Sequence, residues 1–189
     1  MKIGVLALQG AVEEHIRSIE AAGAEGVEVK HAEQLGELDG LIIPGGESTT
    51  IGKLMRKYSF IEPIRQFAAE GKGLFGTCAG LIVLAESIEG GEEPHLCLMD
   101  ITASRNAFGR QRESFETDLD VKGIDNPVRA VFIRAPLITK TGPEVDVLCT
   151  YKDEVVTARQ GKILVTSFHP ELTDDFSLHQ YFLDMIKGG

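Results

Sequence analysis

The stretch LFGTCAGLIVLAE, residues 74–86, places a cysteine between two glycines and between two apolar runs. The spacing G-x-C-x-G predicts a sharp turn from a strand into a helix, because small neighbours leave room for a strained backbone that lifts the central side chain above the sheet. We expect the helix to begin at Ala79, where the positive end of its dipole favours a thiolate at Cys78. The stretch therefore predicts an α/β fold with Cys78 as a candidate nucleophile.

The alternative is that Cys78 is a buried cysteine in a tight turn, since free cysteines are usually core residues. A thiol nucleophile needs a base and a group that orients the base. The segment VTSFHPEL, residues 165–172, offers both in His169 and Glu171. Pro170 favours an extended backbone at His169, and in an extended chain residues i and i+2 point the same way. An H-P-E segment alone suits a surface loop equally well, but with an elbow cysteine it completes a Cys–His–Glu constellation.

Buried strands and amphipathic helices alternate in the first half of the chain. Continuous apolar runs are typical of parallel strands that are covered on both faces, and the helical segments repeat apolar residues every three or four positions. This alternation predicts a three-layer α/β fold with a mainly parallel central sheet. The expected strands cover residues 2–8, 26–32, 39–46 and 73–77, and the expected helices cover 11–23, 47–57, 60–71 and 79–87.

The second half has strand patterns with little helix between them, and the sequence ARQGKI (158–163) is typical of a hairpin. These segments predict antiparallel additions to the sheet. We find no repeat, linker or low-complexity segment, and we expect one domain over residues 1–189. The expected strands cover residues 100–108, 114–122, 129–135, 145–151, 154–160 and 162–168, and a final helix covers 175–187.

Composition argues against several classes of protein. The chain has 189 residues, of which 43% are hydrophobic, and a net charge of −10 at pH 7, so we expect no nucleic-acid partner. Three widely spaced cysteines and five histidines without ligand spacing predict no disulfide framework and no metal; we also expect no cofactor. The N-terminal apolar run is too short to span a bilayer and lacks a signal-peptide cleavage site, so we expect a cytoplasmic protein without membrane contact.

The segment IIPGGEST, residues 42–49, ends an expected strand with two glycines. Glycines at that point can free backbone N–H groups to face a ligand, and Gly46 is a candidate oxyanion donor beside the elbow cysteine. The backbone N–H of Ala79 is a second candidate. A plain tight turn before a helix that Ser48 or Thr49 caps explains the same segment equally well.

Six segments together resemble the class I, or triad, glutamine amidotransferase domain over nearly the whole chain. More narrowly, the sequence is similar to the PdxT family, the glutaminase subunits of pyridoxal 5′-phosphate synthase. The elbow and the H-P-E segment are general to the amidotransferases, whereas LQGA, GGESTT and RNAFGRQ are specific to the narrower family. The six segments are GVLALQGAVEEH (4–15), PGGESTTI (44–51), FGTCAGLI (75–82), SRNAFGRQ (104–111), FIRAP (132–136) and SFHPELT (167–173).

The resemblance implies that Cys78 attacks the side-chain amide of L-glutamine and gives a γ-glutamyl thioester and ammonia. Water would then release L-glutamate. His169 would act as base and then as acid, and Glu171 would orient it. The backbone amides of Gly46 and Ala79 would hold the oxyanion. By the same resemblance, the glutamine-binding residues are Gly46, Glu47, Ser48, Arg105, Ile133 and Arg134.

Glutamine carries an α-carboxylate, and a pocket for it needs a cation. Arg105, Arg110, Arg112 and Arg134 are available, although each alone is more often a solvated surface arginine. Arg134 stands out because it belongs to the strongly apolar strand expected over 129–135, where an arginine is rarely buried without a partner.

The resemblance also implies a partner. If the chain is a single domain, nothing within it consumes ammonia, and ammonia released into water at neutral pH is mostly the non-nucleophilic ammonium ion. The family delivers ammonia to a PdxS-type synthase, which builds pyridoxal 5′-phosphate (vitamin B6) and forms a dodecameric core that carries the glutaminase subunits. Docking activates family members through rearrangement at the oxyanion hole. We hypothesise that Gln9 lies near the oxyanion turn and senses the partner.

Three rival functions stay open at this point. The domain could serve another synthase, such as that of the histidine pathway; it could be a cysteine hydrolase or redox sensor of the DJ-1-like kind; or it could be a silent binding subunit. The segments LQGA, GGESTT and RNAFGRQ favour the vitamin B6 function over the first rival. The H-P-E segment argues against the second, and the intact set of Cys78, His169 and Glu171 argues against the third.

Overall fold

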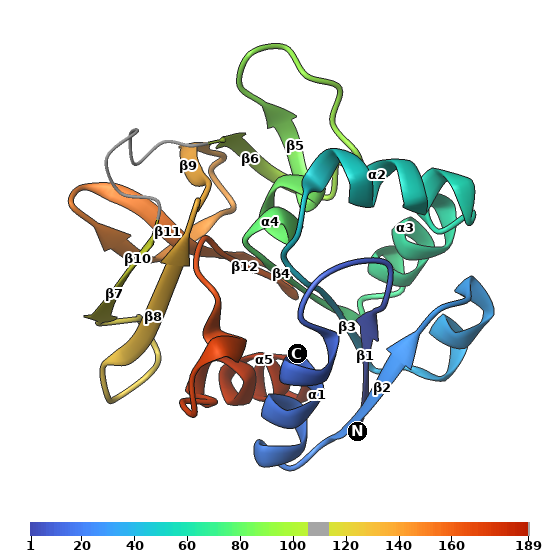
Figure 1. Ribbon diagram of the computed structural model, residues 1–189, viewed down its shortest axis with the longest axis horizontal. Helices are drawn as coiled ribbons and strands as arrows, with labels where there is room; N and C mark the ends of the chain where they lie inside the picture. Colours follow the sequence, from blue (N-terminus) through green and yellow to red (C-terminus); the bar gives the residue numbers. More distant parts are fainter. Residues whose placement is uncertain (106–113, 189) are drawn as a thin grey trace.

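The structure is a computed structural model that describes residues 1–105 and 114–188 (Figure 1). The described strands are β1 (Lys2–Leu6), β2 (Glu25–Val29), β3 (Gly40–Ile43), β4 (Gly73–Thr77), β5 (Ala85–Ile88), β6 (Met99–Ser104), β7 (Ser114–Leu119), β8 (Val128–Ile133), β9 (Leu137–Thr141), β10 (Asp146–Tyr151), β11 (Glu154–Gln160) and β12 (Ile163–Thr166). The described helices are α1 (Val12–Ala21), η1 (Ala32–Glu37), α2 (Ser48–Lys57), α3 (Ile61–Ala69), α4 (Ala79–Leu84), η2 (Pro170–Leu172) and α5 (Ser177–Lys187).

The main sheet has the strand order β2-β1-β3-β4-β12-β11-β9-β6-β5, and β10 pairs with β11. The first five strands of this order run parallel. The next pairings, β12 with β11, β11 with β9 and β9 with β6, are antiparallel. The expected fold class is therefore confirmed: a mainly parallel α/β sheet with antiparallel additions, including the predicted hairpin of β11 and β12.

Side chains of the central strands alternate between two hydrophobic clusters, because successive residues of a strand point to opposite faces of the sheet. In β3, Ile42 belongs to one cluster, whereas Leu41 and Ile43 belong to the other. Helices α2, α3 and α4 pack on the cluster of Leu41, and α1 and α5 pack on that of Ile42. Figure 1 shows α2 and α3 on one side of the sheet and α1 and α5 on the other. The three-layer arrangement is confirmed.

Several expected boundaries are wrong. The helix expected over 79–87 ends at Leu84, and the chain continues as β5, because Ser87 and Ile88 pair with β6 and gain a strand partner that local pattern does not reveal. Strand β9 and the turn η1 were not predicted. The strand expected over 100–108 is β6, which ends at Ser104, and positions 106–108 lie outside the described residues.

Candidate active site

Cys78 occupies the turn between β4 and α4, with a backbone φ of 51° and ψ of −109°. A positive φ is uncommon for a residue with a side chain and costs ~1–3 kcal/mol, so the surrounding structure must hold it. One restraint is the backbone N–H of Cys78, which donates to the carbonyl oxygen of Thr166 at 2.9 Å. The prediction of a sharp strand-to-helix elbow, with the helix beginning at Ala79, is confirmed.

The glycines around the elbow allow close packing. A Cβ atom on Gly76 would lie 2.6 Å from the backbone of Gly80, and one on Gly80 would lie 2.1 Å from the carbonyl oxygen of Ile43. Neither glycine has a positive φ. The G-x-C-x-G spacing therefore reflects how closely β3, β4 and α4 approach one another, and any side chain at these two positions would separate them.

His169 follows β12, and its Nδ1 lies 2.7 Å from Oε1 of Glu171. The side chain of Glu171 is fully buried and that of His169 is 13% exposed. The expected pairing is present, but the expected extended backbone is wrong: residues 170–172 form the turn η2, with Pro170 at its start. Proline fits there because its fixed φ suits the first position of a helical turn. The backbone N–H of His169 donates to the carbonyl oxygen of Val131 at 2.8 Å and ties the turn to β8.

The surroundings of His169 favour its protonated form. Burial lowers the pKa of the imidazole, but hydrogen bonds to Cys78 and Glu171, together with the charge of Glu171, outweigh burial and raise the pKa of His169 to about 10. The imidazolium is then the favoured form at neutral pH. A cysteine beside a protonated histidine is the arrangement in which thiolate nucleophiles occur.

The Pro-Gly-Gly turn lies against the same two side chains. A Cβ atom on Gly45 would lie 2.7 Å from Cε1 of His169 and 3.3 Å from Cβ of Cys78. On the other side of the turn, a Cβ atom on Gly10 would lie 2.1 Å from the carbonyl oxygen of Gly45. Because the C=O and N–H of a trans peptide point in opposite directions, the N–H of Gly46 points away from Gly10.

Gln9 holds the far end of this turn. Its Oε1 accepts a hydrogen bond from the backbone N–H of Glu47 at 2.6 Å. A Cβ atom on Gly46, whose φ is 142°, would lie 2.5 Å from the same oxygen. Gln9 therefore lies beside the Pro-Gly-Gly turn, as the hypothesis requires; the oxyanion role of the turn and the role of Gln9 in sensing a partner stay predictions.

Glu47 caps helix α2. Its carboxylate accepts hydrogen bonds from the backbone N–H groups of Thr49, at 3.1 Å, and Thr50, at 2.7 Å. The expectation that Ser48 or Thr49 supplies the cap is wrong, because the longer side chain of Glu47 reaches both donors from one position earlier. Burial would raise the pKa of Glu47, but the hydrogen bonds from Thr50, Thr49 and Arg105 outweigh it and lower the pKa to about 2.

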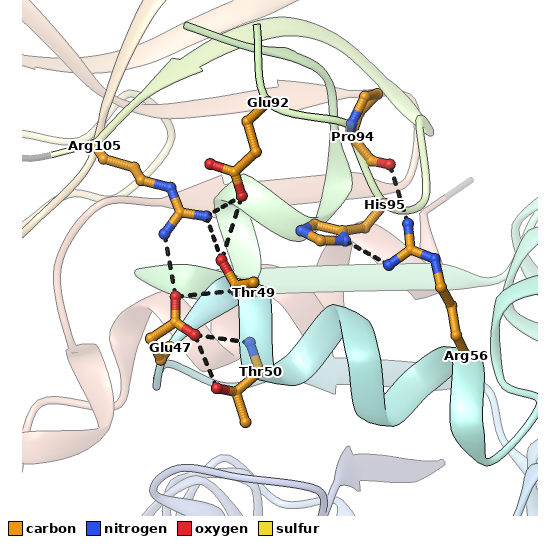
Figure 2. A network of polar contacts seen from close by, with 8 residues as sticks. All are labelled: Glu47, Thr49, Thr50, Arg56, Glu92, Pro94, His95 and Arg105. Atoms are coloured by element: carbon orange, nitrogen blue, oxygen red, sulfur yellow. Dashed lines mark hydrogen bonds and ion pairs between the residues drawn. The ribbon is translucent and has the colours of Figure 1, made fainter. Parts of the chain in front are cut away.

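Arg105 joins the capped helix to the segment before β6, as Figure 2 shows. Its guanidinium lies 3.2 Å from Glu47 and 3.1 Å from Oγ1 of Thr49, and it also binds the carboxylate of Glu92. Arg105 is therefore already paired with two acidic side chains. Farther along α2 in the same view, Arg56 donates to His95.

The remaining predicted binding residues lie around this turn and at the end of β8. Ser48 begins α2 and is buried, and its Oγ has no hydrogen-bond partner within the described chain. The carbonyl oxygen of Ile133 lies 3.9 Å from Sγ of Cys78. Arg134 follows the end of β8, is exposed and has a φ of 46°, so its expected place within an apolar strand is wrong. The other two candidate cations, Arg110 and Arg112, lie outside the described residues.

Sequence reasoning missed a histidine that lies behind the triad. His15, in α1, is fully buried, and its Nε2 lies 3.6 Å from Oε2 of Glu171. A signal was present, because His15 falls three residues after Val12 and four before Ile19, on the inner face of an amphipathic helix. A histidine at such a position must find a buried partner.

The two other cysteines differ from Cys78. Burial, with a smaller contribution from Asp120, raises the pKa of Cys149 to about 11, so this thiol stays protonated and unreactive at neutral pH. Cys97 is exposed. In residues 1–105 and 114–188, no three histidine, cysteine, aspartate or glutamate side chains are grouped to hold a metal ion. No helix described by the structure is long and apolar enough to cross a membrane.

The fold and the elbow define the class of the protein. A crystal structure of a glutamine amidotransferase superposes with a TM-score of 0.93 at 50% sequence identity, and the match covers 98% of each chain. The structure of PurLQS from Thermotoga maritima has the same fold, with a TM-score of 0.73 at 17% identity over 99% of this chain and 97% of that chain. The chain is an α/β protein of the class I glutamine amidotransferase fold.

Sequence comparisons define the family within that class. The model of the SNO glutamine amidotransferase family matches residues 5–188, and the chain belongs to that family. It is 74% identical to pyridoxal 5′-phosphate synthase subunit PdxT of Niallia circulans, over 99% of this chain and 98% of the relative. It is 65% identical to the subunit of the same name from Anoxybacillus flavithermus, over 99% of this chain and 97% of the relative.

Proposed function

We propose that the chain is the glutaminase subunit of a pyridoxal 5′-phosphate synthase. It hydrolyses L-glutamine to L-glutamate and ammonia and delivers the ammonia to a partner synthase subunit for vitamin B6 biosynthesis. The observation that carries the proposal is that the elbow cysteine, Cys78, and His169 lie against the same glycine, Gly45, while Glu171 holds His169 at 2.7 Å. Membership of the amidotransferase family and the identity of 74% to a PdxT subunit support the same function.

The catalytic cycle follows from where the proton is held. With the proton on His169, the Cys78 thiolate attacks the side-chain amide carbon of glutamine and forms a tetrahedral intermediate. When the carbon–nitrogen bond breaks, His169 gives its proton to the leaving nitrogen, and ammonia departs from a γ-glutamyl thioester. His169 then takes a proton from water, which attacks the thioester and releases glutamate and the thiolate. Glu171 orients the imidazole throughout and balances its charge whenever His169 is protonated.

The oxyanion of each tetrahedral intermediate is assigned to the backbone N–H groups of Gly46 and Ala79. Ala79 is the first residue of α4, so its N–H lies at the positive end of the helix. Gly45, which precedes Gly46, packs on Cys78 and His169, which supports placing the second donor there.

The glutamine-binding residues remain those that the family resemblance implies. Two of them have features that suit glutamine binding, because the hydroxyl of Ser48 is buried without a partner in the described chain and the carbonyl of Ile133 faces Cys78. The full set is Gly46, Glu47, Ser48, Arg105, Ile133 and Arg134. Because Arg105 is paired with Glu47 and Glu92, glutamine must share or displace one of these contacts.

The partner we propose is a PdxS-type synthase that forms a dodecameric core carrying the glutaminase subunits. The subunit name of the relatives supports a synthase complex. We further propose that residues 1–189 form one domain, that the protein is cytoplasmic, and that it has no nucleic-acid partner, in line with its net charge of −10. The conformational freedom of Gly46 suits activation by docking, since glycine permits a peptide to reorient.

Glutamate release by the protein alone and with a PdxS-type synthase subunit tests the proposal. Turnover should appear with the synthase, should be weak without it, and should fall by ~10³-fold or more in Cys78→Ala, because the nucleophile is lost. Cys149→Ala is the matched control, since it removes a buried cysteine outside the site and should keep turnover. Strong turnover without a partner would retain the triad but remove the docking switch. The absence of turnover in both conditions would overturn the proposal.

A further inference from the structure

Behind the triad lies a buried row of side chains that the proposed reaction does not use. Glu171 lies between two histidines: Oε1 contacts Nδ1 of His169 at 2.7 Å, and Oε2 lies 3.6 Å from Nε2 of His15. The same Nε2 lies 3.2 Å from Oγ1 of Thr77, the residue before the nucleophile. The other ring nitrogen of His15, Nδ1, lies 2.9 Å from Nε2 of His179 in α5. His15, Glu171 and His179 are almost completely buried.

One assignment of protons suits this row better than the other, because it points an N–H toward the Glu171 carboxylate. Burial holds the pKa of His15 well below its usual range and lowers that of His179 to about 3, so each ring is neutral and carries a single N–H. If Nε2 of His15 carries the proton, it donates to Thr77 and faces Oε2 of Glu171. Nδ1 of His15 then accepts a hydrogen bond from Nε2–H of His179, and the unpartnered atom is Nδ1 of His179, a bare acceptor.

The opposite assignment would let the Thr77 hydroxyl donate to Nε2 of His15, but it is less favourable in two other respects. A proton on Nδ1 of His15 would turn the lone pair of its Nε2 toward the Glu171 carboxylate, which is repulsive. It would also place the proton of His179 on Nδ1, which has no hydrogen-bond partner within the described residues. A buried donor without a partner is costly. Oε2 of Glu171 also has no hydrogen-bond partner within the described residues. An N–H dipole that points toward this oxygen therefore stabilises the carboxylate.

We propose that His15 is a positioning residue of the catalytic triad: as the Nε2–H tautomer, fixed by His179, it points an N–H dipole toward the second oxygen of Glu171 and so restrains the carboxylate that orients His169. The inference rests on the proposed glutaminase function for its kinetic consequence. In metal sites, removal of the side chain that orients a ligand typically changes activity by about 10–100-fold, and we take that range as the guide for His15. His15 does not touch substrate in this arrangement and acts only through Glu171.

The tautomer is measured without turnover. In ¹⁵N-histidine NMR spectra of the protein, His15→Gln and His179→Gln assign the two buried rings. Both should appear as neutral Nε2–H tautomers throughout pH 5–9, while His169 stays protonated over most of that range. The charges that face this row are Glu171, His169 and Asp175, and the tautomer must hold against all three. A Nδ1–H tautomer of His15, or a charged His15 at pH 7, would overturn the proposal.

The kinetic arm uses glutamate release with the synthase present. His15→Leu removes the donor and should lower kcat by about 10–30-fold while KM for glutamine changes less than about 2-fold. His15→Gln keeps an N–H near the Nε2 position and should stay within about 3-fold of the wild type.

Ile19→Ala is the matched control for lost stability. It removes buried volume from the same helix without touching Glu171 and should leave kcat within about 2-fold at a temperature where it is folded. Equal losses in His15→Leu and Ile19→Ala, or no rescue by His15→Gln, would reduce His15 to a packing residue and overturn the proposal. If the wild type itself shows no turnover, the proposed function is wrong. The NMR spectra still determine the tautomer of His15 in that case.

Discussion

The two sides of Glu171 present the same kind of side chain in opposite protonation states. On one side, His169 is 13% exposed and lies 2.7 Å from the carboxylate, and its interactions with Cys78 and Glu171 raise its pKa to about 10. On the other side, His15 is fully buried, lies 3.6 Å away and contacts a second histidine, and its pKa is held well below the usual range. One carboxylate thus supports a cation on one side and a neutral ring on the other.

The difference shows that burial and hydrogen bonding to a carboxylate shift the pKa of a histidine in opposite directions. The geometry of the contact decides which effect is larger. A direct hydrogen bond to an anion stabilises the imidazolium more than desolvation disfavours it, as at His169. A longer separation without that bond leaves desolvation in control, as at His15. The triad needs both results, because the reacting histidine must exchange a proton and the supporting histidine must never do so.

The largest effect is expected when the shared carboxylate is changed. In Glu171→Gln, the single amide oxygen can face His169 or His15 but not both, and the N–H₂ group then faces the N–H of the other histidine. The imidazolium also loses its counter-charge. We expect kcat for glutamate release to fall by on the order of 10²-fold or more, and the pKa of His169, followed by NMR, to fall toward its usual value.

Glu13→Gln is a control for this change, because it removes an exposed carboxylate from α1, the helix that carries His15. This variant should leave kcat for glutamate release and the pKa of His169 as in the wild type. Near-normal kcat in Glu171→Gln would contradict an orienting role for the carboxylate and would remove the basis of the comparison between the two histidines.

A smaller effect is expected in the pH dependence of stability. The unfolded chain protonates His179 near pH 6.5, whereas the folded chain does so only at about pH 3. The unfolded state therefore binds the extra proton between these values, and the stability present above pH 6.5 is lost as the pH falls. In His179→Gln, the free energy of unfolding should fall less steeply as the pH is lowered. The slope should differ from that of the wild type by at most about 1.4 kcal/mol per pH unit.

Urea unfolding at a series of pH values between 7 and 4 measures this slope. His31→Gln removes an exposed histidine and serves as the comparison variant, whose slope should match that of the wild type. Identical slopes in the wild type and His179→Gln would mean that the buried ring is already charged, against the assignment of neutral rings.

The smallest effect is expected at Glu47, an exposed carboxylate that pairs with a cation as Glu171 does. Glu47 also holds a cation, Arg105, but at the surface, where water screens the pair and it contributes little. Its measurable contribution is the cap on α2. Glu47→Ala should lower the free energy of unfolding by about 1 kcal/mol in urea titration.

Glu62→Ala is the control for Glu47→Ala, because it breaks only the surface pair with Arg65 in α3. It should lower the free energy of unfolding by less than about 0.5 kcal/mol. A loss in Glu47→Ala no greater than that of Glu62→Ala would show that the cap adds nothing beyond a surface ion pair.

Much of the fold and the central triad could be predicted from the sequence. The alternation of buried strands and amphipathic helices predicts the layers, and the elbow and the H-P-E segment predict Cys78, His169 and Glu171, because these signals are local in the chain. The prediction failed where a distant partner decides: β5 forms only because β6 lies beside it, and Glu47 became the cap of α2 through the reach of its side chain.

The sequence by itself determined the class of fold and the family and predicted a nucleophile with its base, because each of these is carried by motifs of a few neighbouring residues. Only the tertiary structure decided what stands behind the triad. His15 and His179 are 164 residues apart; they contact each other, and His15 lies beside Glu171, only after α1 and α5 pack on one face of the sheet. No local pattern encodes such a contact, because it depends on the relative placement of two helices and a turn that long-range packing alone fixes.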